Sequence, residues 1–265
     1  LVPTQFIRFL KLPDGVKQTF SGESLQVVWH GAAPCPPEVK RQMIEWWGPK
    51  ITEYYGGTEA GVVSIVSSQD WLARPGTLGR PQPTMEVYVV DDDGRRLGPN
   101  QPGTLYFRST MGADFEYHRD PEKTAKAHLE PGVYTLGDIG YVDDDGWLFM
   151  SDRKIDMIIS GGVNIYPAEI EGVLVTHPAV RDAAVFGVPD EEFGEAVKAA
   201  VELTDGLVAS PELLADIMRF CKERLAGYKV PRSIDVEAAL PRHPTGKLYK
   251  RLLRDPHWEG SGRTI

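Results

Sequence analysis

Residues 152–171 read DRKIDMIISGGVNIYPAEIE, and this stretch separates two parts of the chain that differ in sequence pattern. At its centre lie three small residues, Ser160, Gly161 and Gly162, which are typical of a loop or of a close approach between backbones. Apolar residues then recur at helical spacing over residues 166–175. The stretch therefore predicts a turn followed by a helix, at the start of a new domain.

Upstream of this stretch, residues 1–152 indicate the remainder of a larger α/β domain. Residues 25–28 form an apolar run, a loop follows, and residues 36–47 have helical spacing, which predicts a strand, a loop and a helix. Within residues 75–150, short strand-like runs alternate with Asp-Gly turns, a pattern typical of hairpins or of a small β-barrel-like subdomain. Residues 153–265 alternate helix and strand and predict a small α+β domain. The expected fold class is therefore α/β, in two domains.

The composition of the 265 residues is typical of a soluble globular protein, with 42% hydrophobic and 25% charged residues. The 38 acidic residues exceed the 29 basic ones, and the net charge of −9 disfavours a nucleic-acid partner. No apolar run approaches the roughly 20 residues of a membrane helix, so no integral membrane segment is expected. Two cysteines, Cys35 and Cys221, are too few for a disulfide framework and fit a reducing cytoplasm. Leu1 opens directly on an amphipathic stretch, which is typical of a start inside an element.

A second small-residue segment, residues 54–61, is expected to form a loop of the size that holds a ligand. Its residue types suit a nucleotide, because Tyr55 offers an aromatic face to a base and the glycines allow close backbone approach. Thr58 offers a hydroxyl to a phosphate oxygen, and Glu59 offers a carboxylate to Mg²⁺. A plain turn explains the same residues, so this segment alone leaves both interpretations open.

Two further motifs do not support the ligand sites that they suggest at first. The DDDG sequence at residues 143–146 could begin a calcium loop, but Tyr141 stands where the spacing requires an acid, so a hairpin turn is favoured. The TGK sequence at residues 245–247 differs from a Walker A motif, because Pro241 stands in place of the leading glycine. Neither calcium nor P-loop chemistry is therefore expected.

Four motifs in order carry a resemblance that none of them carries alone. The chain has YYGGTE at residues 54–59, TLGD at 135–138, the stretch 152–171, and PRHPTGK at 241–247. This combination strongly resembles the adenylate-forming (ANL) superfamily of acyl-CoA synthetases, aryl-CoA ligases, luciferases and peptide-synthetase adenylation domains. Members of that family use Mg·ATP to convert a carboxylate to an acyl-adenylate and pyrophosphate, and then pass the acyl group to coenzyme A.

The resemblance implies a nucleotide site in the first part of the chain. The loop after the first expected strand is similar to the family's adenine and acyl pocket, and its residues are Gly31, Ala32, Ala33 and Pro34. In the YGGTE motif, Tyr55 would pack on adenine, with Gly56 and Gly57 beside it, while Thr58 would contact phosphate and Glu59 would hold Mg²⁺.

The other motifs imply roles in both half-reactions. Asp138 resembles the aspartate that binds both ribose hydroxyls, and Arg153 resembles the arginine near ribose and phosphate. Lys247 matches the lysine that bridges the attacking carboxylate and the α-phosphate. The Ser160-Gly161-Gly162 loop would lie beside the pantetheine channel of coenzyme A, and rotation of a small mobile C-terminal domain would exchange the two arrangements.

Two departures from the family pattern leave two functional hypotheses. Ile155 stands at the hinge position that is usually Asp or Lys, and the family's phosphate-gripping loop that ends in Pro-Lys does not occur in this sequence. The chain therefore resembles the C-terminal half of a longer acyl-CoA synthetase, with ATP, coenzyme A and a hydrophobic acid, either a fatty acid or a steroid side-chain acid, as substrates. The alternative is a non-catalytic fragment that only binds a nucleotide or a complementary chain. A homodimer or a complementary N-terminal half is the expected protein partner.

Overall fold

A computed structural model of the chain describes residues 1–243 and 248–259 and divides into two compact units. Unit 1 comprises Leu1–Pro3 and Pro13–Ile155, and unit 2 comprises Thr4–Leu12 and Asp156–Ile265. The chain thus passes from one unit to the other between Ile155 and Asp156, within the stretch 152–171 at which the sequence pattern changes. The grouping of Thr4–Leu12 with unit 2 has no signal in the sequence.

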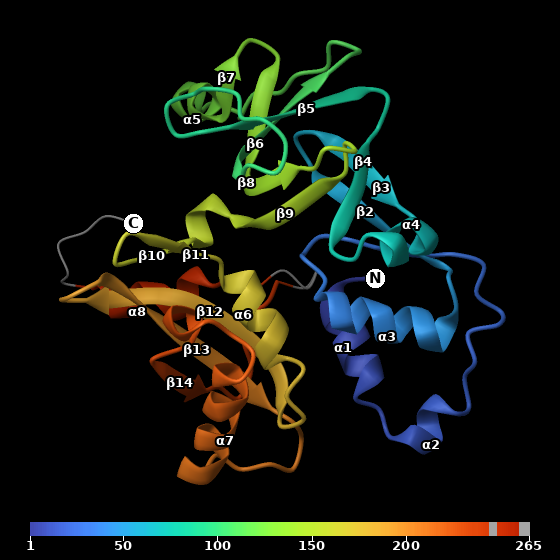
Figure 1. The fold of residues 1–265 in the computed structure, drawn as a ribbon, viewed down its shortest axis with the longest axis vertical. Helices are drawn as coiled ribbons and strands as arrows, with labels where there is room; N and C mark the ends of the chain where they lie inside the picture. Colours follow the sequence, from blue (N-terminus) through green and yellow to red (C-terminus); the bar gives the residue numbers. More distant parts are fainter. Residues whose placement is uncertain (244–247, 260–265) are drawn as a thin grey trace. The chain divides into compact units, whose positions relative to one another are not determined.

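Unit 1 is built around a nine-stranded sheet (Figure 1). The strands are β1 (Val28–His30), β2 (Ile51–Gly57), β3 (Gly61–Val66), β4 (Thr77–Pro81), β5 (Met85–Val90), β6 (Gly103–Ser109), β7 (His128–Glu130), β8 (Val133–Val142) and β9 (Leu148–Arg153). Their order is β1-β2-β3-β4-β9-β8-β6-β5, with β7 paired to β8, and only β1 and β2 run parallel. Within the described residues, β1 and β5 lie at the two ends of this order, so the barrel-like region does not close into a barrel.

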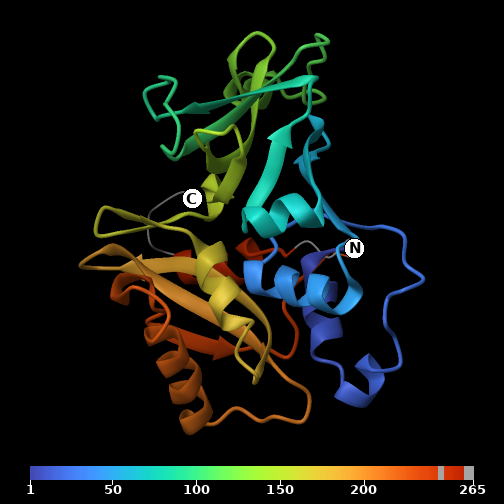
Figure 2. The same ribbon diagram turned by 45° about the vertical axis from the view of Figure 1, so that its right-hand side comes forward.

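Four helices accompany this sheet: α2 (Asp14–Lys17), α3 (Pro37–Trp47), α4 (Ser68–Ala73) and α5 (Pro121–Ala127). The expected helix over residues 36–47 is confirmed as α3, which has proline in its first turn and ends at Gly48, whose φ is 82°. Ser67 caps α4 by accepting a hydrogen bond from the backbone N–H of Asp70 at 3.1 Å. Figure 2 shows α4 beside β4.

One core cluster of unit 1 is contributed by strands β2, β3, β4, β5, β6, β8 and β9. Its buried residues are Tyr55, Val63, Leu78, Met85, Val89, Leu105, Phe107, Tyr134 and Leu148. The rings of Tyr55 and Phe107 have their centroids 6.0 Å apart. Tyr55 is therefore packed as a core residue as well as standing in the YGGTE motif.

The expected loop over residues 54–61 is wrong for its first half. Tyr54, Tyr55, Gly56 and Gly57 complete β2, and only residues 58–60 form the turn into β3. Aromatic residues suit a strand, and glycine permits a close pairing here, since a Cβ on Gly56 would lie 1.9 Å from the carbonyl oxygen of Gly61.

Unit 2 contains two smaller sheets and four helices within the described residues (Figure 1). The hairpin β10 (Ile158–Ser160) and β11 (Val163–Ile165) turns at two glycines, and β12 (Val180–Asp190), β13 (Gly194–Leu203) and β14 (Ser233–Val236) form a three-stranded sheet. The helices are α1 (Pro3–Leu10, all but its first residue), α6 (Pro167–Leu174), α7 (Pro211–Lys222) and α8 (Arg251–Trp258). Short 3₁₀ turns lie at Lys154–Asp156, between the units, and at Gly227–Lys229.

In unit 2, helices pack on the three-stranded sheet. Helices α6 and α8 both contact β12. A cluster of Ala184, Phe186, Ala200 and Leu240 is buried on this sheet. The alternation of helix and strand expected for residues 153–265 is therefore confirmed, and with it the α/β fold class.

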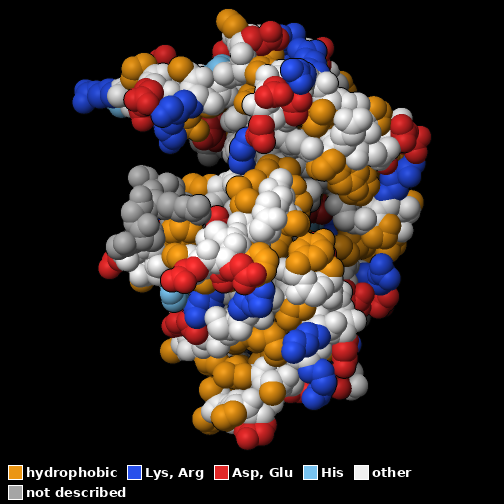
Figure 3. All heavy atoms as spheres, turned by 60° about the vertical axis from the view of Figure 1, so that its left-hand side comes forward, with side chains coloured by type: hydrophobic (Ala, Val, Ile, Leu, Met, Phe, Trp, Pro, Cys, Tyr) orange, Lys and Arg blue, Asp and Glu red, His pale blue; other side chains and the backbone are white. Residues whose placement is uncertain are grey.

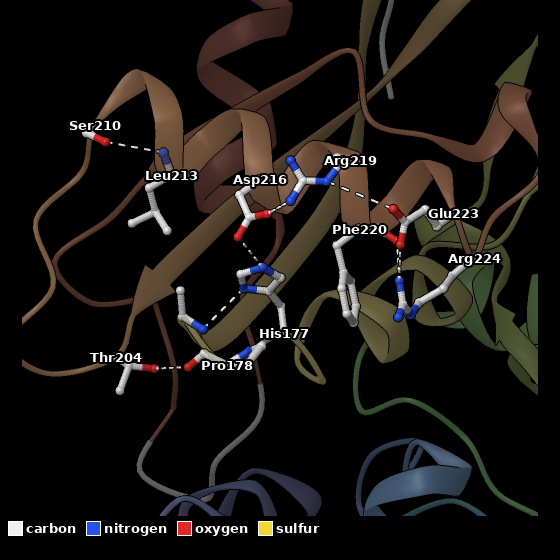
Figure 4. Close-up of polar contacts among 11 residues, drawn as sticks. His177, Pro178, Thr204, Ser210, Leu213, Asp216, Arg219, Phe220, Glu223 and Arg224 are labelled. Carbon is white, nitrogen blue, oxygen red and sulfur yellow. Dashed lines mark hydrogen bonds and ion pairs between the residues drawn. The ribbon is translucent and has the colours of Figure 1, made fainter.

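Helix α7 is held by its cap and by a histidine that lies beside it. Ser210 accepts a hydrogen bond from the backbone N–H of Leu213 at 3.2 Å, as its place before Pro211 predicts. His177 Nε2 lies 3.4 Å from Oδ2 of Asp216, and its Nδ1 accepts from the backbone N–H of Ala179 at 3.1 Å (Figure 4). Because Nδ1 accepts, the neutral ring fits this site and the imidazolium does not.

The surface drawn in Figure 3 mixes acidic and basic side chains among apolar ones, so neither sign of charge forms a single continuous patch on that face. No helix in the described ranges 1–243 and 248–259 is long and apolar enough to cross a bilayer.

His177 should make the unfolding free energy of unit 2 depend on pH. Burial lowers its pKa below the ordinary value of 6.5, and the nearby carboxylate of Asp216 opposes this shift. Below pH 6.5 the unfolded chain therefore binds a proton that the folded chain excludes, and stability falls as the pH falls. Urea unfolding at several pH values between about 5 and 8 should show a shallower acid loss for His177→Gln than for the wild type. Equal pH slopes in the two proteins would contradict this account.

Candidate functional site

Tyr55 and Asp138 meet inside unit 1. Tyr55 lies near the end of β2 and Asp138 lies on β8, and the Tyr55 hydroxyl donates to Oδ2 of Asp138 at 2.6 Å. Only 8% of Tyr55 and 3% of Asp138 are exposed. Burial, followed by the charge of Asp138, raises the pKa of Tyr55, so the phenol keeps its proton and remains a donor. This contact joins two residues, 83 positions apart, that the motifs assign to one nucleotide site.

Arg153 approaches the same carboxylate from the neighbouring strand. Asp138 on β8 and Arg153 on β9 are direct cross-strand partners, and Arg153 Nε lies 3.6 Å from Oδ1 of Asp138. The arginine side chain is 47% exposed, whereas the aspartate side chain is 5% exposed. A cation thus lies at the surface directly beside a buried acceptor, which suits a ligand that carries both hydroxyl and phosphate groups.

The Gly31-Ala32-Ala33-Pro34 loop follows β1, whose last residue, His30, pairs with Glu53 of β2. Because the pairing is parallel and in register from Val28 with Ile51, residues 31–34 leave β1 beside residues 54–57, through which β2 continues. A Cβ on Gly31 would lie 2.8 Å from the ring carbon Cζ of Tyr54, and only glycine fits this approach. Ala32 has φ of 68°, a left-handed conformation that non-glycine residues rarely adopt outside constrained sites. Two of the expected nucleotide segments are therefore neighbours.

The turn between β2 and β3 presents Thr58 and Glu59. Thr58 is exposed, Glu59 is half-buried, and Glu59 Oε1 accepts a hydrogen bond from the Tyr117 hydroxyl at 3.0 Å. Burial and then Glu59 raise the pKa of Tyr117, so it also stays a donor. Tyr117 was not predicted as a site residue, because no local pattern marks it. Only the folding of the chain brings it to Glu59, 58 positions away.

Glu59 is the residue expected to hold Mg²⁺. No group of three or more His, Cys, Asp or Glu that could hold a metal ion occurs in the part of the chain that the structure describes. Mg²⁺ in nucleotide enzymes is commonly bound by one or two carboxylates together with substrate phosphates and water. The single, half-buried carboxylate of Glu59 fits that mode of binding and does not fit a site made of protein ligands alone.

The remaining expected residues belong to unit 2. Ser160 ends β10, and Gly161 and Gly162 form the turn with φ of 57° and 79°, as a two-residue hairpin turn requires. The backbone N–H of Gly161 donates to the carbonyl of Phe193 at 2.8 Å, which ties this turn to the loop between β12 and β13. This hairpin therefore belongs to unit 2, whereas Tyr55 and Asp138 belong to unit 1.

Lys247 lies outside the described residues, but the positions on either side of its segment are well held. Arg242 and Leu248 pair across an antiparallel bridge. Arg242 also donates two hydrogen bonds of 2.8 Å to the buried carboxylate of Asp182 on β12. A bidentate pair of this kind fixes both the position and the orientation of the arginine.

Comparison with known families assigns both units. Residues 1–113 match the family described as AMP-binding enzyme, and residues 169–247 match the AMP-binding enzyme C-terminal domain. These matches, together with the relatives below, show that the chain belongs to the AMP-binding enzymes, the adenylate-forming superfamily that its four motifs resemble.

Relatives of known name cover nearly all of the chain. It is 39% identical over 96% of its length to a 3-[(3aS,4S,7aS)-7a-methyl-1,5-dioxo-octahydro-1H-inden-4-yl]propanoyl:CoA ligase of Rhodococcus jostii, of which it spans 46%. It is 35% identical over 97% of its length to a long-chain-fatty-acid–CoA ligase of Bacillus subtilis, of which it spans 45%. The chain thus spans about half the length of the curated relatives it matches.

Solved structures of the same family share the fold. The amide bond synthetase McbA of Marinactinospora thermotolerans matches 96% of this chain with a TM-score of 0.82 and 35% identity, and the match spans 51% of that protein. The anthranilate CoA ligase AuaEII, solved with anthranoyl-AMP, matches 99% of this chain with a TM-score of 0.86 and 29% identity, and the match spans 50% of that protein.

Removal of the Tyr55 hydroxyl should weaken nucleotide binding through Asp138. We expect Tyr55→Phe to raise the AMP dissociation constant roughly tenfold, because Asp138 is then no longer held in place before the nucleotide binds. Tyr88→Phe is the matched control, because it also removes a hydrogen bond from a tyrosine to a carboxylate, that of Tyr88 to Glu86 on β5. Calorimetric titration of the folded proteins with AMP measures the effect, and equal affinities for both variants would contradict the role of this contact.

Proposed function

We propose that this chain is the C-terminal part of an acyl-CoA synthetase that activates a hydrophobic carboxylic acid with ATP. The first step would give acyl-AMP and pyrophosphate, and the second would transfer the acyl group to coenzyme A. The observation that carries this proposal is the joining of Tyr55, Asp138 and Arg153 in one contact group, beside the turn that bears Thr58 and Glu59. Relatives named as CoA ligases over almost the whole chain support the same activity.

Asp138 would hold the ribose of the nucleotide. A carboxylate offers about four acceptor positions, and the Tyr55 hydroxyl uses one of them on Oδ2. Further acceptor capacity of Asp138 would then serve the two ribose hydroxyls, while the exposed Arg153 guanidinium faces the phosphate side. Tyr55 fixes the carboxylate before the nucleotide arrives, which lowers the entropic cost of binding.

The loops around this group would bind the rest of the nucleotide. Gly31, Ala32, Ala33 and Pro34 would line adenine and the acyl group, and Tyr55, Gly56 and Gly57 would form the opposite wall. The exposed Thr58 hydroxyl would contact phosphate, and Glu59 would hold Mg²⁺ with Tyr117 fixing one of its oxygens. When bound, Mg²⁺ supplies charge that offsets the developing negative charge on the leaving pyrophosphate.

The two halves of the reaction would use different parts of unit 2. Lys247 would stand between the acyl carboxylate and the α-phosphate and reduce the repulsion of two anions during the first step. The Ser160-Gly161-Gly162 turn would face the pantetheine arm of coenzyme A during the second. Residues 1–152 would form part of the large AMP-binding domain and residues 153–265 the small mobile domain, a division that the two family matches support.

The acid would be large and apolar, either a fatty acid or a steroid side-chain acid. The relatives support this, because one is named for a bicyclic indene-derived propanoyl group and another for long-chain fatty acids. Gly57 and Gly61, which carry no side chain, would leave room for a bulky acyl group, but the space is present only at Gly61. Nothing lies within 4 Å of a Cβ on Gly61, whereas Leu136 lies 3.2 Å from a Cβ on Gly57.

The same proposal implies protein partners and a cellular location. A complementary N-terminal half, in the same or another chain, would supply the phosphate loop, and a homodimer is the other partner arrangement. The two cysteines are both free thiols, which supports a reducing cytoplasm.

Lys247→Ala should separate the two steps in the complete enzyme. Acid-dependent pyrophosphate release should fall about 100-fold or more, since the lysine acts on charge that develops in that step. Thioester formation from supplied acyl-AMP should stay close to the wild-type rate. Equal loss of both steps would refute the role of Lys247, and AMP binding without any pyrophosphate release by the wild type would favour the non-catalytic alternative.

A panel of acetate, benzoate, palmitate and a steroid side-chain acid tests the acyl class. Palmitate or the steroid acid should exceed acetate in kcat/KM by about tenfold or more, because an apolar pocket discriminates through buried hydrocarbon. Preference for acetate would contradict the assignment of a large hydrophobic acid.

A further inference from the structure

A buried ion pair lies next to two segments of the candidate nucleotide site, residues 31–34 and residues 54–59. Lys40 projects from α3 and Glu53 from β2, and Lys40 Nζ lies 2.5 Å from Glu53 Oε2. The lysine side chain is 0% exposed and the glutamate side chain 6% exposed. Burial lowers the pKa of Lys40 and raises that of Glu53, and in each case the charge of the partner opposes the shift.

Two further elements close around this pair. His30, the last residue of β1, faces Glu53 with Nε2 3.7 Å from Oε2. Burial and the charge of Lys40 lower the pKa of His30 to about 2, so the ring is neutral. On the other side, Lys40 Nζ lies 4.9 Å from the centroid of the Trp71 ring on α4. The cluster therefore joins β1, β2, α3 and α4.

The position of the cluster in the chain connects it to the site. His30 immediately precedes the Gly31-Ala32-Ala33-Pro34 loop, and Glu53 lies two residues before Tyr55. Gly31 follows His30, and Tyr54 follows Glu53. Gly31 and the Tyr54 ring lie so close together that there is no room for a Cβ on residue 31. Any shift of Glu53 relative to α3 would therefore move both loops.

Stability alone does not account for a charged pair at this place. Burial of two charges carries a desolvation cost that the attraction between them roughly offsets, and apolar pairs of similar volume often replace such ion pairs without loss of stability. A short hydrogen bond between charged groups is directional, so it can fix the position of α3 relative to β2.

We propose that Lys40 and Glu53 are positioning residues that hold the loop of residues 31–34 and the end of β2 with its turn, residues 54–59, at the separation that the nucleotide requires. Neither side chain reaches the nucleotide itself in this role. The inference rests on the proposed function, because it assigns a task to these residues only if unit 1 binds adenylate.

The test replaces the ion pair by apolar side chains of similar size, as Lys40→Met with Glu53→Leu in one chain. This double variant should unfold at a urea concentration close to that of the wild type, whereas its AMP dissociation constant should rise about tenfold or more. The matched control is Lys198→Met with Asp235→Asn, which removes the ion pair of 2.9 Å between β13 and β14 of unit 2. The control should leave AMP affinity unchanged.

Glu53→Gln keeps the size of the side chain and one acceptor for Lys40, and serves if the double variant does not fold. It should weaken AMP binding several-fold and shift the backbone amide resonances of Gly31 and Gly57 in the free protein. Wild-type AMP affinity in a folded double variant, or an unchanged affinity and unchanged amide shifts in Glu53→Gln, would overturn the positioning role alone. Failure of the folded wild type to bind AMP would instead overturn the proposed function, and this inference with it.

Discussion

Parallel pairing of β1 with β2 is the constraint on which the rest of the candidate site depends. Because the two strands point the same way and His30 stands opposite Glu53, the segments that follow them emerge side by side at one edge of the sheet. One of these segments is the Gly31–Pro34 loop and the other carries Tyr55 and the Thr58-Glu59 turn. Across the sheet, the antiparallel strands β3, β4, β9 and β8 follow β2 in that order. Asp138 on β8 accepts a hydrogen bond from the Tyr55 hydroxyl. A different order of strands would leave the same motifs far apart.

The candidate site combines buried residues that bond to each other with exposed residues that a ligand can reach. Tyr55 is bonded to Asp138 and Lys40 to Glu53, and all four are buried, whereas Arg153 and Thr58 are exposed and can contact a ligand. A site built in this way is arranged before its ligand binds, so less binding energy is lost in ordering side chains. The residues proposed for the second step, Ser160, Gly161 and Gly162, belong to unit 2, after the change of unit at Ile155. A reaction in two steps with opposite requirements suits a protein built from two units.

Much of the fold could be predicted from local patterns. Ser210 as a cap and Pro211 in the first turn predict a helix over residues 211–225, and the structure forms it over Pro211–Lys222. Residues 36–47 and 166–175 also form helices close to the expected bounds. The loop expected at residues 54–61 was wrong for Tyr54 to Gly57, because glycines suggest a turn until the partner strand that they accommodate is known. The contacts of Tyr55 with Asp138, Tyr117 with Glu59, and Lys40 with Glu53 were not predicted. They depend on strand order and helix placement, which no local spacing records.

The central claim is that the ends of β1 and β2, together with Asp138, form a nucleotide site within unit 1. Titration of the isotope-labelled chain with AMP, followed through its backbone amide resonances, tests this claim most directly. The account predicts saturable shifts concentrated at residues 31–34, at residues 55–59 and around Asp138, with β12 and β13 of unit 2 unaffected. Shifts that cluster away from these residues, or a folded chain whose resonances do not change at saturating AMP, would contradict it.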